Sequence, residues 1–468
     1  MKNFTKLSIL SLVGVLVFTS CETTELDLTS NPNALGPDQA SADLFINAIQ
    51  EDFAYFVDEL GSPGLRLTRQ LHDFFRDYDN AYTPIDWDGV WSNAYQGIME
   101  DIRLMTILAE EASLSYYVGM GEVFQAYIYI SLVDYFGDVP YTEALQGSEN
   151  LNPSSDGGQS VYQAALGLLD SAIANFNAGG SGPQYDMYYG GDAQKWIKAA
   201  NSIKKKAYLN MGDYSSYNSI SNYITSSADD FQFQWGTNVS NPDTRSPIYR
   251  SNYTNNGASD FQSNWLMNRL MVGRGGVRDP RINYLIYRQQ GDTPGIDAPS
   301  DEVLLQCGVP GFFIEPHRIA YGLYCGLPEG YWGRDHGDDS GINPDQSRRA
   351  LSGIYPSGGS YDSGEFVPQY LSDGSGGAGI TPIILSSWMN FFDAEVAVNT
   401  NGDPTAGTLA GIESFMNKVD DITGAPDISQ ADIDEYIAAF ASEWTAASLE
   451  GKLEMWAEEF MITQVGNG

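Results

Sequence analysis

Residues 119–145, GMGEVFQAYIYISLVDYFGDVPYTEAL, decide the fold class. The first eighteen of them are apolar around almost the whole circumference of a helix. Such a helix is buried, either in a large protein or in a membrane. The run is interrupted by polar residues and is too short to span a bilayer. Gly137 suits a left-handed helix cap, and Pro140 cannot continue the helix. We therefore predict a buried central helix within a mainly α-helical core.

The periodicity of apolar residues predicts further helices on both sides of this stretch. The expected ranges are 39–60, 87–108, 159–176, 193–211, 281–290, 383–400, 406–419 and 428–464, the last with one break. Asp279 and Pro280 mark the start of the helix at 281–290. We expect the lysines of 193–211 to form a solvated face. Short strands are expected at 231–235 and 303–305. Consecutive helices pair at roughly the spacing of tetratricopeptide repeats, about 34 residues per pair.

Composition divides the chain into regions. Residues 39–225 are expected to form a helical-hairpin scaffold, 226–381 a loop-rich ligand-binding region, and 382–468 helices that pack on the scaffold. Long loops in a folded chain are functional or disordered, and the many aromatic residues favour a functional role. The 29 tyrosines and nine tryptophans serve either surface recognition or packing between helices, and both alternatives stay open.

The N-terminus has the pattern of a secretory signal. Lys2 and Lys6 precede an apolar run from 7 to 18, then small residues and Cys21. We expect residues 1–20 to be a lipoprotein signal peptide, Cys21 to carry the lipid, and residues 21–38 to be an extended tether. The alternative is an ordinary cleavage site at which Cys21 is incidental.

Charge and motifs exclude several functions. The formal net charge is −37, so the chain is not expected to bind nucleic acid through a basic surface. The sequence contains no HExxH, GxSxG or P-loop motif. A pair of hydrolytic carboxylates cannot be recognised among 61 acidic residues. We expect no enzymatic activity and no cofactor.

Two further features each leave an alternative. Cys307 and Cys325 lie in a loop-rich region and are expected to form a disulfide, or else to be two free thiols. The segment 335–343 offers Asp335, Asp338 and Asp339 as oxygen ligands for Ca²⁺, but it lacks the EF-hand spacing. We favour an Asx-rich turn over a calcium site.

Several motifs, in this order, resemble the SusD/RagB family of outer-membrane nutrient-binding lipoproteins. They are Asn31-Pro32-Asn33, Trp91-x-x-x-Tyr95-x-Gly97, YFGDVPY at 135–141, Lys195-Trp196, Arg278-Asp279-Pro280-Arg281, Gly333-Arg334-Asp335 and the segment 388–395. Proteins of this family usually continue beyond a turn like Gly466-Asn467-Gly468, so we expect the sequence to be truncated at 468.

The resemblance implies a tetratricopeptide-like superhelix with long loop insertions and minor β-structure. It also implies a lipid-anchored protein on the outside of the outer membrane. Such a protein binds oligosaccharides and passes them to a SusC-like TonB-dependent transporter. The alternative is a surface lipoprotein of the same fold that binds peptides or proteins, and a secreted glycan hydrolase is a weaker third possibility.

A sugar-binding surface needs exposed aromatic rings beside hydrogen-bonding side chains. We expect recognition in the aromatic loops between about 65 and 87 and between about 231 and 344, rather than in 119–145. Each candidate can instead be structural. The candidates are Tyr78, Asn80, Tyr82, Trp87, Tyr249, Asn252, Tyr253, Trp265 and Trp332.

Overall fold

The computed structural model describes residues 40–74, 81–255, 257–293, 324, 327–337, 348–370 and 373–467. Residues 42–468 form one compact unit. The expected signal peptide, tether and lipidation site at Cys21 lie outside the described residues, as do Cys307, Cys325 and the strand expected at 303–305. Their assignments stay predictions.

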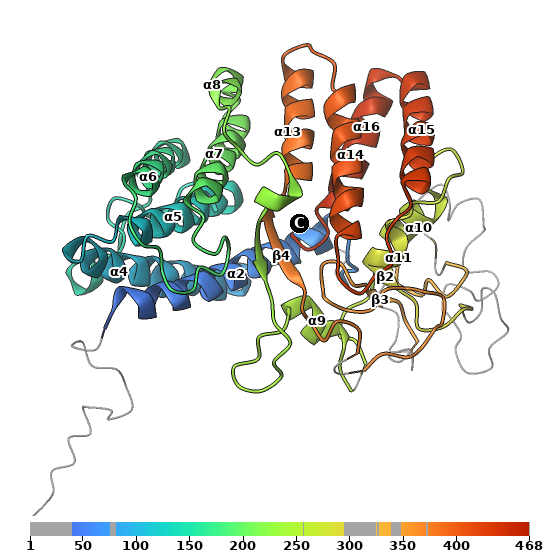
Figure 1. Cartoon of the computed structure of the whole chain (residues 1–468), viewed down its shortest axis with the longest axis horizontal. Coiled ribbons are helices and arrows are strands. Elements are labelled where there is room, and N and C mark those ends of the chain that lie inside the picture. The colour runs from blue at the N-terminus through green and yellow to red at the C-terminus, as the bar shows by residue number, and fades with distance from the viewer. Residues whose placement is uncertain are drawn as a thin grey trace, which may run out of the picture. The chain divides into compact units, whose positions relative to one another are not determined.

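The first group of helices packs in chain order (Figure 1). Helix α4 packs on α5, α5 on α6, and α6 on α7, while α2 contacts α4, α5 and strand β4. The elements are α2 (Ala42–Leu67), η3 (Pro84–Trp87), α3 (Asp88–Ser92), η4 (Asn93–Ile98), α4 (Met99–Glu111), α5 (Ser115–Phe136), η5 (Gly147–Glu149), α6 (Gly158–Ala178), α7 (Ala193–Asn210), α8 (Tyr214–Ser219) and η6 (Ser227–Asp229).

Helix α5 is the buried centre of this group, as predicted. Met120, Val123, Phe124, Ile128 and Leu132 are completely buried. The helix ends at Gly137, which has a φ of 79°. Only a residue without a Cβ adopts such a backbone freely, so glycine is required at this turn.

The middle of the chain contributes short elements. They are β1 (Phe231–Gln234), α9 (Pro247–Asn252), α10 (Asn264–Val272), α11 (Ile282–Leu285), β2 (Ile286–Tyr287), β3 (Leu351–Ser352) and β4 (Ile380–Ile384). Strand β1 pairs antiparallel with β4, with Phe233 opposite Thr381, and β2 pairs antiparallel with β3. The helix expected at 281–290 is therefore wrong beyond one turn, because Ile286 and Tyr287 pair as a strand.

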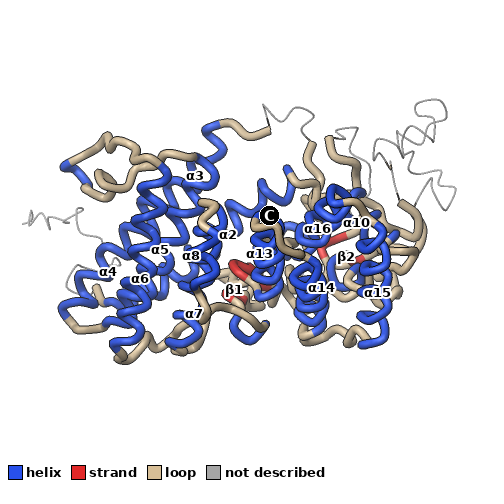
Figure 2. The backbone as a smooth tube through the Cα atoms, turned by 90° about the horizontal axis from the view of Figure 1, so that it is seen from above, coloured by secondary structure: helices blue, strands red, loops and turns tan. Residues whose placement is uncertain are grey.

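The last group of helices follows strand β4. It comprises α13 (Ser386–Asn399), α14 (Thr405–Asp420), α15 (Gln430–Ala446) and α16 (Leu449–Thr463). Figure 2 shows these helices beside one another and apart from α4–α6, and α13 also contacts α7. The predicted break in the last range is confirmed between α15 and α16. The mainly α-helical, tetratricopeptide-like fold class is confirmed as well.

The prediction that the lysines of α7 form a solvated face is wrong most clearly at Lys205. Lys205 is buried, and its ammonium lies 3.7 Å from the ring centroid of Tyr217 and 4.1 Å from that of Tyr223. Asp393 supplies an opposite charge at 3.6 Å. The ammonium is stabilised by the two π-faces and the carboxylate instead of by water.

A buried charge network joins the middle of the chain to the last helix. The Arg281 guanidinium donates to Asp279 at 2.5 Å and to Glu459 at 2.6 Å, and all three side chains are fully buried. Arg274 Nε donates to Glu459 at 3.0 Å, and the Tyr436 hydroxyl donates to the same carboxylate at 2.8 Å. These pairs fix the 274–281 segment against α15 and α16.

Within the described residues, no helix is both long enough and apolar enough to cross a membrane.

Candidate functional site

The pocket with the chemistry best suited to a ligand lies between the α3–η4–α4 face and the loop that follows α5. We call it the tryptophan pocket, and its volume is about 700 Å³. The residues that line it are Asp88, Trp91, Ser92, Tyr95, Gln96, Glu100, Pro140, Ala144, Leu145, Gly147, Asn150, Leu151 and Pro153.

Helical spacing builds one wall of this pocket from two parallel rows. Trp91 and Tyr95 are four residues apart, and their rings stack with centroids 5.4 Å apart and planes inclined by 10°. Beside them, Asp88, Ser92, Gln96 and Glu100 recur every four residues, which places them on one helix face. The π-helical turn η4 lies in this stretch, and such turns occur frequently at functional sites. The wall thus combines aromatic faces with hydrogen-bonding groups.

The opposite wall is the loop that begins with the glycine turn after α5. Val139 and Asp156 close its base through two backbone hydrogen bonds of 3.2 and 2.9 Å. The Asp156 carboxylate accepts from the backbone N–H groups of Tyr141 and Thr142, both at 2.9 Å, and these bonds lower its pKa. The Tyr95 hydroxyl donates to the Pro140 carbonyl at 2.7 Å. The two walls are therefore tied together directly.

A second, smaller pocket of about 390 Å³ is lined by residues that mostly precede those of the tryptophan pocket in the sequence. They include Tyr82 and Trp87, together with Glu59, Thr83 and Asp86. The two rings are 5.7 Å apart. Burial is the main cause that raises the pKa of Tyr82 to about 12, so its hydroxyl stays a donor at neutral pH. Phe136 packs 5.4 Å from Trp87 and 5.1 Å from Trp91, and so supports one tryptophan of each pocket.

The structure brings together only some of the residues predicted for ligand binding. Tyr82 and Trp87 share a pocket, whereas Tyr78 and Asn80 lie outside the described residues. Trp265 is half-buried and packs against the main core. The ligand roles of these residues stay predictions.

For four other residues the expectation of an exposed surface is wrong. Tyr249 and Tyr253 are fully buried and stack on each other at 4.4 Å, and Asn252 and Trp332 are at most 2% exposed. The hydroxyl of Tyr249 donates to the Asp373 carbonyl, and that of Tyr253 donates to the Ser352 carbonyl. The two hydroxyls thus form their hydrogen bonds within the core, and these side chains present no face to a ligand in this structure.

The expected recognition loops also omitted residues that line the tryptophan pocket. Trp91 and Tyr95 lie in the helix expected at 87–108, outside the expected recognition loops, and recognition is not expected in 119–145. Yet Pro140, Ala144 and Leu145 line the pocket. The sequence does contain a signal for this pocket, which is the four-residue spacing of Trp91 and Tyr95 beside a row of polar residues with the same spacing.

Among the calcium candidates, Asp335 is described and Asp338 and Asp339 are not. The Asp335 carboxylate accepts from the Asn264 amide and from the Tyr324 backbone N–H, each at 2.9 Å. Across the described ranges, no three His, Cys, Asp or Glu side chains gather as metal ligands would. The calcium site stays a prediction, with the Asx-rich turn as its alternative.

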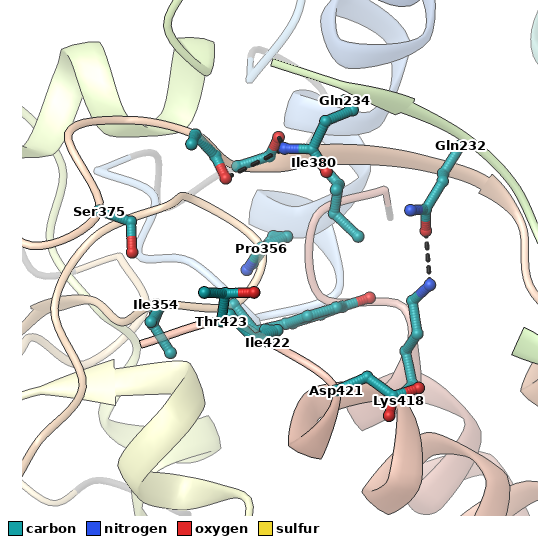
Figure 3. A pocket seen from close by; sticks show the side chains of 13 residues that line it. Gln232, Gln234, Ile354, Pro356, Ser375, Ile380, Lys418, Asp421, Ile422 and Thr423 are labelled. Atoms are coloured by element: carbon teal, nitrogen blue, oxygen red, sulfur yellow. Dashed lines mark hydrogen bonds between the residues drawn. The ribbon is translucent and has the colours of Figure 1, made fainter. Parts of the chain in front are cut away.

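A third cavity, of about 550 Å³, lies between the β1–β4 pair and the end of α14 (Figure 3). Lys418 donates to the Gln232 side chain at 2.6 Å and pairs with Asp230 at 2.9 Å. Gln234 donates to the carbonyls of Ala378 and Gly379. These polar groups bond to the protein itself, and the aromatic residue that lines the cavity, Tyr355, is fully buried. The cavity therefore lacks an open aromatic face.

Comparison with known proteins agrees with this architecture. A family model described as "Starch-binding associating with outer membrane", SusD-like, matches residues 38–297. The chain belongs to the SusD-like family. Proteins of this family bind nutrients in association with the outer membrane and are binding proteins rather than enzymes. No curated protein matches the sequence significantly.

Solved structures share the fold at low sequence identity. A SusD homologue from Bacteroides fragilis is 17% identical with a TM-score of 0.59, and the match covers 91% of this chain and 84% of that one. A SusD/RagB family protein from Bacteroides thetaiotaomicron is 16% identical with a TM-score of 0.60 and coverages of 91% and 86%. A chitin-binding protein is 17% identical with a TM-score of 0.59 and coverages of 91% and 84%.

Proposed function

We propose that this protein binds an oligosaccharide in the tryptophan pocket. The observation that supports the proposal is the stacked Trp91–Tyr95 pair beside Asp88, Ser92 and Gln96. A sugar ring has an apolar face that packs on aromatic rings, and hydroxyl groups that bond to amides, carboxylates and other hydroxyls. Tyr82 and Trp87 in the second pocket offer further aromatic faces for other units of a chain.

We propose further that the protein acts on the outside of the outer membrane, anchored by a lipid on Cys21, and that it delivers its ligand to a SusC-like TonB-dependent transporter. The family's association with the outer membrane and the signal-like N-terminus support this arrangement. Expression of Cys21→Ser should release the protein from the membrane fraction. Retention of this variant in that fraction would contradict lipid anchoring at Cys21.

Calorimetric titration of the protein with an oligosaccharide panel tests the binding proposal. The panel contains starch-type, cellulose-type and chitin oligomers, because related structures include a chitin-binding protein and the family description names starch. Truncating an aromatic ring at the centre of a contact costs about 2 kcal/mol, roughly a 30-fold loss of affinity. Trp91→Ala should show a loss of this size.

Trp456→Ala is the matched control. Trp456 is also half-buried and packs on another aromatic residue, Phe460, at 5.5 Å, but it lies in α16. Its truncation should lower stability without changing affinity. An equal loss of affinity in both variants would show a general effect of unfolding. Binding of peptides with no heat from any glycan would favour the peptide-binding alternative, and release of shortened glycans would favour a hydrolase.

A further inference from the structure

The two segments that line the tryptophan pocket are rich in carboxylates. Segments 84–102 and 140–156, which supply all the residues that line it, contain seven carboxylates and no lysine or arginine. These carboxylates are Asp86, Asp88, Glu100, Asp101, Glu143, Glu149 and Asp156. Two of them, Asp88 and Glu100, line the pocket itself.

The basic residue that follows the first of these segments, Arg103, is already paired with a carboxylate. Arg103 lies one turn beyond Glu100 on α4, and its guanidinium donates to both oxygens of Glu100, at 2.8 and 2.6 Å. Arg103 does not line the pocket. This ion pair offsets the charge of Glu100, but it leaves no free cation for an anionic ligand at this wall.

Several of these carboxylates are held in the ionised form. Hydrogen bonds from Arg103 lower the pKa of Glu100, and backbone hydrogen bonds from Thr83 and Ser154 lower the pKa values of Asp86 and Glu143. Burial has the opposite effect on Asp101 and raises its pKa. The negative field therefore persists throughout the neutral range. It acts through solvent, so it is strong at low ionic strength and falls within a Debye length of about 10 Å at 0.1 M salt.

We infer that the tryptophan pocket selects uncharged glycans and rejects anionic ones such as uronate or sulfated chains. This inference rests on the proposed glycan-binding function. Neutral hydroxyls donate hydrogen bonds to Asp88 and Glu100 without opposing charge. Each carboxylate or sulfate on a ligand instead meets like-charge repulsion, with no cation among the residues that line the pocket to compensate. The carboxylates of the site thus act in two ways: they accept hydrogen bonds from neutral glycans, and their negative charge filters out anionic ones.

Calorimetric titration at low and at high salt tests the filter. The neutral probes are starch-type, cellulose-type and chitin oligomers, and the anionic probes are galacturonate and heparin-derived oligomers of equal length. We expect at least one neutral oligomer to bind and the anionic ones to bind at least tenfold more weakly at low salt, with a smaller difference at high salt.

Charge-altered variants separate the pocket's field from the protein's overall charge. Asp88→Lys should raise affinity for anionic oligomers about tenfold at low salt, and Asp88→Asn should raise it less. The control Glu435→Lys makes the same charge change at an exposed site on α15 and should change nothing. Anionic binding as tight as neutral binding would overturn the filter and leave glycan binding intact. Binding of no glycan at all would overturn both proposals.

Discussion

The buried network around Glu459 allows a direct test of what connects the middle of the chain to its last helix. In Glu459→Gln the side chain keeps its shape and loses its charge. Arg281 and Arg274 then share the interior with Asp279 and the partly exposed Glu458. A buried cation without full compensation is costly, because the interior solvates charge poorly.

The expected magnitude follows from burial. Breaking a fully buried ion pair by removing one partner costs about 3–5 kcal/mol in the free energy of unfolding. Glu458 is the matched control, because it also accepts from two arginines, Arg269 at 2.5 Å and Arg274 at 2.9 Å, but its side chain is 28% exposed. Solvent-exposed pairs contribute about 0–1 kcal/mol. Glu458→Gln should therefore cost much less than Glu459→Gln.

Urea unfolding of both variants and the unaltered protein measures the difference. Burial raises the pKa of Glu459, but the charges of Arg281 and Arg274 outweigh it and the net shift is downward from 4.5. The network therefore stabilises the fold at neutral pH, and its contribution is lost as the pH falls below 4.5 through the lowered pKa. The gap between the unaltered protein and Glu459→Gln should narrow in acid. Equal costs for the two variants at neutral pH would refute this account of the network.

Three more predictions concern packing, pH and metal. In Gly411→Ala the new Cβ would lie 2.4 Å from the Phe391 ring, so α14 should be destabilised by about 1–3 kcal/mol in thermal unfolding, whereas Gly167→Ala, with no atom within 4 Å, should be neutral or stabilising. Burial, and next the neighbouring Glu59, raises the pKa of Asp58 to about 7. The folded state therefore loses stability as the pH rises from about 4 to 7. Asp58→Asn should be as stable as the unaltered protein near pH 4 and more stable above pH 7. A difference in unfolding free energy between the two proteins that does not change with pH would contradict the raised pKa of Asp58. If 335–343 is an Asx-rich turn, exchange of calcium for EDTA should leave the melting temperature unchanged, and a calcium-dependent increase would establish the metal site instead.

Apolar periodicity was sufficient to predict most of the helices. Helix α5 could be recognised because its apolar residues leave no polar face, and α15 and α16 fall within the range 428–464 that was expected to be helical with one break. The predicted helix boundaries were wrong where residues pair as strands instead of continuing a helix. Ile380–Ile384 pairs with β1 and delays the start of α13, and Ile286–Tyr287 pairs with β3 and ends α11 after one turn. Such pairings join residues far apart in the chain and leave no local signal.

The candidate site could be predicted only in part, since burial decides what an aromatic residue does. Tyr82 and Tyr253 both lie in Tyr- and Asn-rich segments. Yet Tyr82 lines a pocket, whereas the hydroxyl of Tyr253 bonds to a backbone carbonyl in the core. The packing of Phe136, at the end of α5, on both Trp87 and Trp91 could not be predicted either, because it joins residues that lie far apart in the chain and share no local pattern.

The long reach of the Arg281–Glu459 pair has a consequence for the order in which the chain folds. Helices α4 to α7 pack on their neighbours in sequence, so the contacts of this part close only short loops. Arg281 instead bonds to Glu459, which lies 178 residues later in the chain. Before α16 packs, Arg281 has only one of its two buried carboxylate partners, Asp279, so burial of the segment around it is less favourable. We therefore expect the local contacts of α4 to α7 to form earlier in folding than the contacts that join the 274–281 segment to α16.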